Sequence, residues 1–150
     1  MSVLNNLKKL NRKERYWLLA NATADGDDLR LSAGFRERLG KALSGVVVPE
    51  DAWVAMDYHL DWLKAALAGS ALNVGEIYDN RDGAIAGTQE DLDLLIAWEE
   101  ASHTQLIMIE AKGDGAWSQT QFDSKVGKLA AMLPREDFER VGVTPRLALT

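Results

Sequence analysis

In the first half of the chain, apolar residues recur at intervals of three and four, which is typical of amphipathic helices. Two such helices are predicted over 11–22 and 32–43. A third is expected from Pro49, which suits the first helical position, to Gly69, which suits a helix end. Its predicted core-facing stripe consists of Trp53, Met56, Leu60, Leu63 and Leu67.

The second half changes to segments typical of strands. Four strands are predicted, over residues 72–78, 92–98, 105–111 and 144–150. Before the last of them, a helix is expected to begin at Ser118, because Gln121 completes the pattern of a capping box. Its apolar stripe consists of Phe122, Val126, Leu129 and Leu133. The same helix is expected to present Lys125 and Lys128 to solvent.

The two central strands are apolar on both alternating sets of positions. A sheet with two apolar faces has to be covered by helices on both sides. The pattern therefore predicts an α/β fold, with a small mixed central sheet flanked by helices. The length of 150 residues fits a single domain over 1–150, with a helical N-terminal part over 1–70.

The composition of the chain limits the kinds of protein and of functional site that it can form. The chain is 47% hydrophobic and 27% charged, as in ordinary globular proteins, and its net charge of −6 argues against nonspecific nucleic-acid binding by the whole surface. It has no cysteine and two histidines, so disulfides are excluded and a histidine-built zinc site is not expected. The first residues lack the apolar core of a signal peptide, and the apolar stretch 52–68 carries charged residues. A soluble cytoplasmic protein with no membrane segment is expected.

Two carboxylates and an ammonium group meet if the two central strands form an antiparallel hairpin. A loop over 99–104 sets Asp93 opposite Glu110, and Lys112 then lies on the same face because side chains alternate along a strand. Two neighbouring carboxylates repel unless a proton or a cation lies between them. With oxygen donors and no thiolate, the expected ion is Mg²⁺ or Mn²⁺.

This arrangement resembles the PD-(D/E)XK nuclease superfamily, whose fold is restriction-endonuclease-like. The matching residues are Asp93 in "EDLDLLIAW" and Glu110 and Lys112 in "LIMIEAKGD", followed by the helix "SQTQFDSKVGKL". The resemblance covers 72–150 and implies the element order αβββαβ, with an additional helical segment before it. Leu92 stands where the proline that names the motif is expected.

The resemblance implies Mg²⁺-dependent hydrolysis of phosphodiester bonds. DNA is the first expected substrate, and RNA is the second. Asp93, Glu110 and the backbone carbonyl of Ala111 would bind the cation, and Lys112 would orient the attacking water. The family often adds an acid from its first helix. Candidates for such auxiliary roles are Glu14, which also fits a capping box with Asn11, the pair Asp57 and Asp61 at helical i, i+4 spacing, and Gln121.

Other interpretations stay open at the level of sequence. Glu110 and Lys112 also fit a strand-end ion pair, and the acidic net charge also fits a non-catalytic interaction or regulatory module that has kept the fold. Many nucleases of this family act as symmetric pairs, so a homodimer is a further hypothesis. The residues indicate neither a preferred nucleotide sequence in the substrate nor a choice between endonuclease and exonuclease action.

Overall fold

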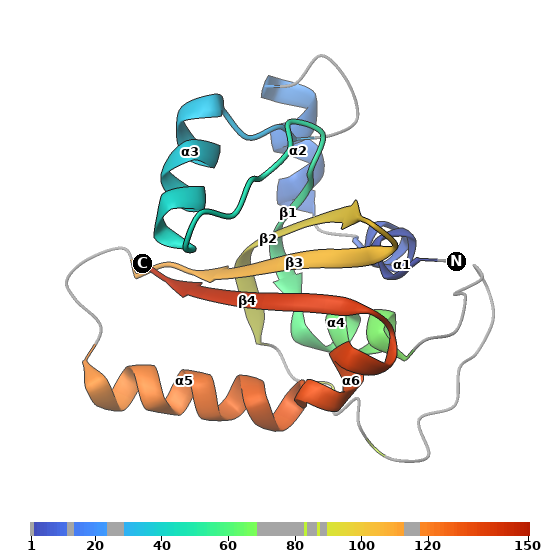
Figure 1. Ribbon diagram of the computed structural model, residues 1–150, viewed down its shortest axis with the longest axis vertical. Coiled ribbons are helices and arrows are strands. Elements are labelled where there is room, and N and C mark those ends of the chain that lie inside the picture. The colour runs from blue at the N-terminus through green and yellow to red at the C-terminus, as the bar shows by residue number, and fades with distance from the viewer. Residues whose placement is uncertain are drawn as a thin grey trace.

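The computed structural model describes residues 2–11, 14–23, 29–68, 83, 87, 90–112 and 118–150. Within these residues, four strands form one mixed sheet in the order β1-β2-β3-β4. The strands are β1 (Trp53–His59), β2 (Asp91–Glu100), β3 (His103–Glu110) and β4 (Val143–Leu149). β1, β2 and β3 pair antiparallel in chain order, and β4 pairs parallel to β3 (Figure 1). The predicted mixed sheet of an α/β fold is therefore confirmed.

Six helices accompany the sheet in the described part of the chain. They are α1 (Val3–Leu10), α2 (Glu14–Thr23), α3 (Ala33–Ala42), α4 (Leu60–Leu67), α5 (Gln119–Met132) and α6 (Arg135–Arg140). Figure 1 shows α2 and α3 on one side of the sheet and α4, α5 and α6 on the other. Helices on both sides are what two apolar sheet faces require. None of the helices in the described ranges is both long and apolar enough to span a membrane.

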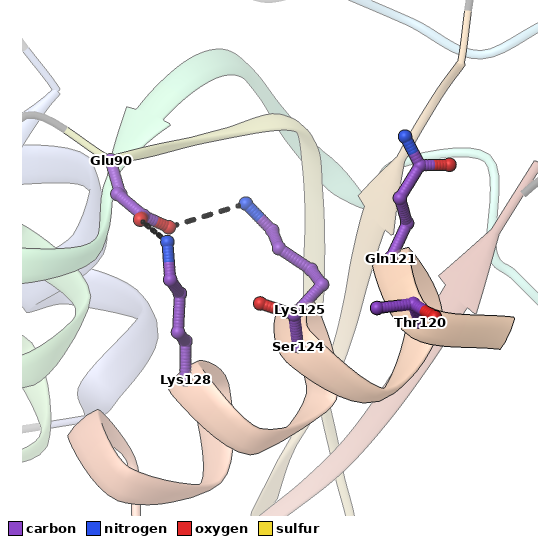
Figure 2. Close-up of a pocket in the computed structure, with 6 residues that line it drawn as sticks. All are labelled: Glu90, Thr120, Gln121, Ser124, Lys125 and Lys128. Atoms are coloured by element: carbon purple, nitrogen blue, oxygen red, sulfur yellow. Dashed lines mark hydrogen bonds and ion pairs between the residues drawn. The ribbon is translucent and has the colours of Figure 1, made fainter. Parts of the chain in front are cut away.

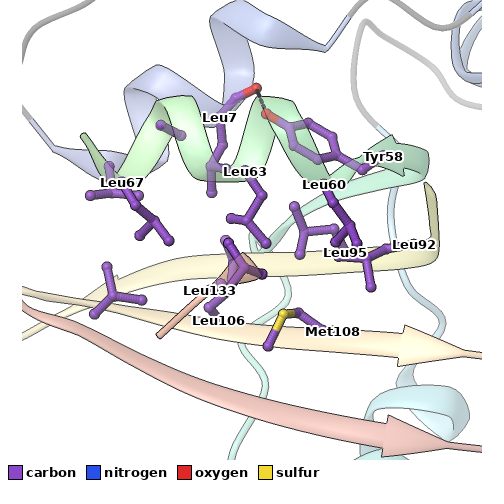
Figure 3. Close-up of a cluster of buried hydrophobic side chains, with 14 of the residues drawn as sticks. Leu7, Tyr58, Leu60, Leu63, Leu67, Leu92, Leu95, Leu106, Met108 and Leu133 are labelled. Carbon is purple, nitrogen blue, oxygen red and sulfur yellow. Dashed lines mark hydrogen bonds between the residues drawn. The ribbon is translucent and has the colours of Figure 1, made fainter. Parts of the chain in front are cut away.

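Each face of the sheet has its own apolar core. On one face, residues of α1, α4, α5 and α6 pack with strand residues such as Leu95, Leu106 and Met108 (Figure 3). On the other face, Leu39 of α3 packs with Ile96 of β2 and other strand residues. The alternation of residues 95 and 96 between the two cores follows from the strand period of two.

The predicted hairpin of the two central strands is confirmed. Its turn is Ala101–Ser102, and both residues have positive φ values, 46° and 71°, as in the tight turns that suit the twist of a hairpin. The register pairs Trp98 with Gln105 and continues to Leu94 and Ile109. This register brings Asp93 and Glu110 to the same end of the hairpin.

The predicted third helix is wrong in its first half, because residues 53–59 form β1 and only 60–67 are helical. Trp53 and Met56 fit a helical stripe, but Val54 and Ala55 are also buried, so both faces of this segment are covered. A short apolar run that is buried on both faces has no distinctive period, and pairing with β2 decides its structure. The strand predicted over 72–78 lies outside the described residues.

Helix α5 begins as predicted, with Ser118 as its N-cap and a complete capping box with Gln121. Its apolar stripe is only partly buried: Leu129 and Leu133 are buried, whereas Phe122 is 41% exposed. The second half of α5 therefore anchors the helix in the core. Its first half carries polar side chains past the ends of β2 and β3.

Candidate functional site

The carboxylate of Asp93 completes the pairing of β2 with β3 at the end of the hairpin. Asp93 Oδ2 accepts a hydrogen bond of 2.7 Å from the backbone N–H of Ala111, one residue beyond the end of β3. On the other side of β3, the Glu110 carbonyl accepts from Thr150 and the Lys112 N–H donates to Thr150. Ala111 is thus held between β2 and β4, and Asp93 lies at the point where β3 ends.

Glu110 and Lys112 both point toward α5, as the period of two predicts. Glu110 Oε1 lies 2.9 Å from Lys125 Nζ, and Lys112 Nζ donates to Gln121 Oε1 at 3.0 Å. Gln121 Oε1 also accepts from the backbone N–H of Ser118 at 3.2 Å as part of the capping box. The two side chains of the β3 end thus each contact α5, which differs from the strand-end ion pair that the sequence also fits.

Glu110 is the most deeply buried charged residue of this group, with 7% of its surface exposed. Burial raises the pKa of Glu110, and the charges of Asp93 and Glu90 act in the same direction, while Lys125 opposes them. Asp93 and Glu110 lie at the same end of the hairpin, and the negative charge of Asp93 disfavours the charged form of Glu110. A cation between them would relieve this repulsion.

Lys125 is not the solvent-facing residue that the helical pattern predicts. Its side chain is 18% exposed, and its Nζ lies between Glu110 and Glu90, 3.5 Å from Glu90 Oε2. Burial lowers the pKa of Lys125, but the hydrogen bond and charge of Glu110 and the charge of Glu90 more than offset this, so the pKa is raised overall. The sequence contains one indication that Lys125 faces the site: it follows Gln121 by four residues, so both side chains lie along the same edge of α5.

A pocket of about 500 Å³ lies between α5 and the start of β2. Its lining residues are Glu90, Thr120, Gln121, Ser124, Lys125 and Lys128 (Figure 2). Glu90 bridges the two lysines, with Oε1 at 2.8 Å from Lys128 Nζ. The hydrogen bond from Lys128 lowers the pKa of Glu90, and both lysine charges add to the effect. Glu90, which the sequence presents only as one of several neighbouring acids, is thus an organising residue of the pocket.

The auxiliary acids predicted from the sequence are not assembled around Asp93 and Glu110. Asp57 and Asp61 are not stacked on one helix, because Asp57 belongs to β1 and Asp61 to the first turn of α4. The β1–β2 register skips Asp57, whose φ is 48°, and Asp57 forms an ion pair with Arg15 at 3.1 Å. Glu14 is exposed at the first position of α2, and its predicted capping box is wrong because Asn11 instead ends α1.

The donors at the end of the hairpin suit a hard cation that keeps part of its water. Within the described ranges, no group of three or more His, Asp or Glu residues is placed to hold a metal ion. Two carboxylates, however, each keep one oxygen without a hydrogen bond or ion pair in those ranges, namely Asp93 Oδ1 and Glu110 Oε2. Mg²⁺ is commonly bound by one or two carboxylates together with several waters.

Comparison of the chain with protein-family models, with curated proteins and with solved structures finds no match.

Proposed function

We propose that this protein is a Mg²⁺- or Mn²⁺-dependent nuclease of the PD-(D/E)XK kind that hydrolyses phosphodiester bonds, with DNA as the first expected substrate. The observation that carries the proposal is the position of Asp93 and Glu110 at the ends of two paired strands, with Lys112 on the face of Glu110. Hard oxygen donors beside an ammonium group suit an anionic phosphodiester.

In this proposal each residue has a separate task. Asp93 Oδ1, Glu110 Oε2 and the carbonyl of Ala111 would hold the cation, which supplies positive charge to the attacked phosphate when it is bound. Lys112 would orient a water molecule whose oxygen forms the new P–O bond, while the bond to the leaving oxygen breaks and that oxygen takes up a proton. Gln121 would position Lys112 through the 3.0 Å contact to its ammonium group.

The order of the elements also supports the proposal. An antiparallel β1–β2–β3 meander is followed by α5 and α6 and then by β4, parallel to β3. The family order αβββαβ, which the sequence resemblance implies, has the same sequence of strands if β1 (Trp53–His59), which precedes the range of the resemblance, takes the place expected for a strand over 72–78. The short helix α4 between β1 and β2 is an addition to that order.

The proposal is tested by incubating supercoiled plasmid and single-stranded DNA with the protein and Mg²⁺ or Mn²⁺. The Asp93→Ala and Lys112→Ala variants are expected to lose at least about 100-fold in cleavage rate. Lys41→Ala is a suitable control, because Lys41 is exposed and its ion pair is with Glu37, one helical turn away. Equal cleavage by all of these proteins would contradict the mechanism, and cleavage of RNA only would change the substrate but not the chemistry.

A second candidate function is a non-catalytic interaction or regulatory module. It is favoured by the ion pair of Glu110 with Lys125, since this carboxylate already has a cationic partner. Calorimetric titration with Mn²⁺ separates the two candidates. A nuclease requires binding that Asp93→Ala and Glu110→Ala remove, whereas a module of this kind requires none.

A further inference from the structure

We propose that Lys125 is a built-in competitor of the divalent cation: its ammonium group forms an ion pair with Glu110 and has to be displaced when the cation binds. This inference rests on the proposed function, because it assigns a regulatory residue to the same site. The affinity of the site for the metal would then depend on Lys125 of α5 as well as on Asp93 and Glu110 of the hairpin.

The contact between Lys125 and Glu110 has the features of a charge pair that compensates burial. The two atoms are 2.9 Å apart, and the side chains are only 18% and 9% exposed. A buried carboxylate without a positively charged partner is costly, so Lys125 stabilises the charged form of Glu110. A divalent ion at Glu110 would be a second positive charge within a few ångströms of this ammonium group, and the two cations would repel each other in poorly hydrated surroundings.

The structure also supplies a place to which the displaced ammonium group can move. Glu90 Oε2 already lies 3.5 Å from Lys125 Nζ, on the side of the pocket (Figure 2). Lys128 holds the other oxygen of Glu90 at 2.8 Å and so keeps this carboxylate in position. Lys125 can therefore exchange Glu110 for Glu90 through a small side-chain movement, without being left unpaired.

Lys112 does not have this role, although it is closer to Glu110 in sequence. Its ammonium group donates to the amide oxygen of Gln121 at 3.0 Å. Within the described residues, the ion pair of Glu110 is with Lys125, at 2.9 Å. Lys125 is therefore the lysine that holds the carboxylate that the metal requires.

The test is calorimetric titration of the full chain with Mn²⁺. Lys125→Met is expected to bind Mn²⁺ about tenfold more tightly than the wild type, because the cation no longer has to displace the ion pair of Lys125 with Glu110. Lys125→Arg keeps the competing charge and is expected to retain the wild-type affinity. Lys64→Met is the matched control, because Lys64 is 17% exposed in an ion pair with Asp137 on α4 and α6.

Equal or weaker Mn²⁺ binding by Lys125→Met than by the wild type would overturn the inference and leave the nuclease proposal standing. Absence of Mn²⁺ binding in every variant, with the folded state verified by circular dichroism, would overturn both. A role of Lys125 limited to stability would lower the thermal midpoint of Lys125→Met without tightening Mn²⁺ binding.

A measurement on the wild type covers the case in which Lys125→Met does not fold. The ¹⁵Nζ resonances of the lysine side chains are recorded while Mg²⁺ is added. The resonance of Lys125 is expected to shift with the same midpoint as calorimetric Mg²⁺ binding, and that of Lys64 is expected to stay unchanged. A Lys125 resonance that does not move while Mg²⁺ binds would overturn the inference.

Discussion

The carboxylate of Asp93 and the backbone N–H of Ala111 are joined by a hydrogen bond of 2.7 Å, so the first acid of the candidate site also closes the ladder between β2 and β3. One oxygen of Asp93 is structural in this arrangement, and the other, Oδ1, has no hydrogen bond or ion pair within the described residues. The two tasks of the residue can therefore be separated experimentally.

We predict that Asp93→Asn keeps the stability of the wild type to within about 0.5 kcal/mol, because its amide oxygen can still accept from Ala111. Asp93→Ala loses this acceptor and is expected to be about 1 kcal/mol less stable. Both variants are expected to lose Mn²⁺ binding. Urea denaturation and Mn²⁺ calorimetry on the two variants measure the separation, and wild-type Mn²⁺ affinity in Asp93→Asn would show that the charge of Asp93 has no part in the site.

Gln121 connects the start of α5 to Lys112, since its side-chain oxygen accepts from both Ser118 and Lys112. Replacing it by alanine is expected to cost about 1 kcal/mol of stability through the lost cap. It is also expected to lower the DNA cleavage rate by about tenfold, because Lys112 loses the acceptor that positions it.

Gln119→Ala is the matched control for this prediction, because Gln119 is exposed in the same turn and donates to Asp123 rather than to a residue of the site. Its cleavage rate is expected to equal that of the wild type. A Gln121→Ala variant that cleaves DNA as fast as the Gln119→Ala control would remove the positioning role.

The buried hydroxyl of Tyr58 ties β1 to α1. It donates to the carbonyl of Leu7 at 2.9 Å, in the last turn of α1, where carbonyl groups lack complete intrahelical partners (Figure 3). Tyr58→Phe leaves this buried carbonyl without the bond and is expected to cost about 1–3 kcal/mol of unfolding free energy. Urea denaturation measures the loss. A variant as stable as the wild type would mean that water or a local shift replaces the hydroxyl.

The pH dependence of stability is expected to include a contribution from Glu90. The hydrogen bond from Lys128 lowers the pKa of Glu90 below its ordinary value of 4.5. The unfolded chain therefore binds the proton more readily, so this stabilisation is present above pH 4.5 and is lost as the pH falls through the lowered pKa. We predict that Glu90→Gln is less stable than the wild type at neutral pH and that the difference shrinks in acid.

Urea denaturation over a series of pH values measures this effect. In a Lys128→Met background, the loss of stability caused by Glu90→Gln is expected to depend less on pH, because the main cause of the pKa shift is gone. A difference in stability that is constant from neutral to acidic pH would contradict the assignment.

Much of the sheet and of the hairpin end could be predicted because local rules determine them. The apolar runs of β2 and β3 and the polar segment between them predict a hairpin, and the strand period places Glu110 and Lys112 on one face. The capping box of Ser118 and Gln121 predicts the start of α5 for the same reason, since the bonds are made within one turn.

The remaining parts depend on tertiary pairing. Residues 53–59 carry apolar side chains at helical spacing, and only the partnership with β2 makes them a strand. The ion pair of Lys125 with Glu110 depends on where α5 crosses the end of β3, which no local pattern in either segment determines. The separation of Asp57 from Asp61 follows from the same change of strand into helix at Leu60.

The most direct test of the nuclease proposal is a crystal structure grown with Mn²⁺, with anomalous diffraction data collected for manganese. The expected result is an anomalous peak between Asp93 Oδ1 and Glu110 Oε2, within about 2.0–2.6 Å of both oxygens, and a Lys125 side chain that has moved toward Glu90. A well-ordered structure without manganese between these two carboxylates, at Mn²⁺ concentrations that saturate the calorimetric signal, would contradict it.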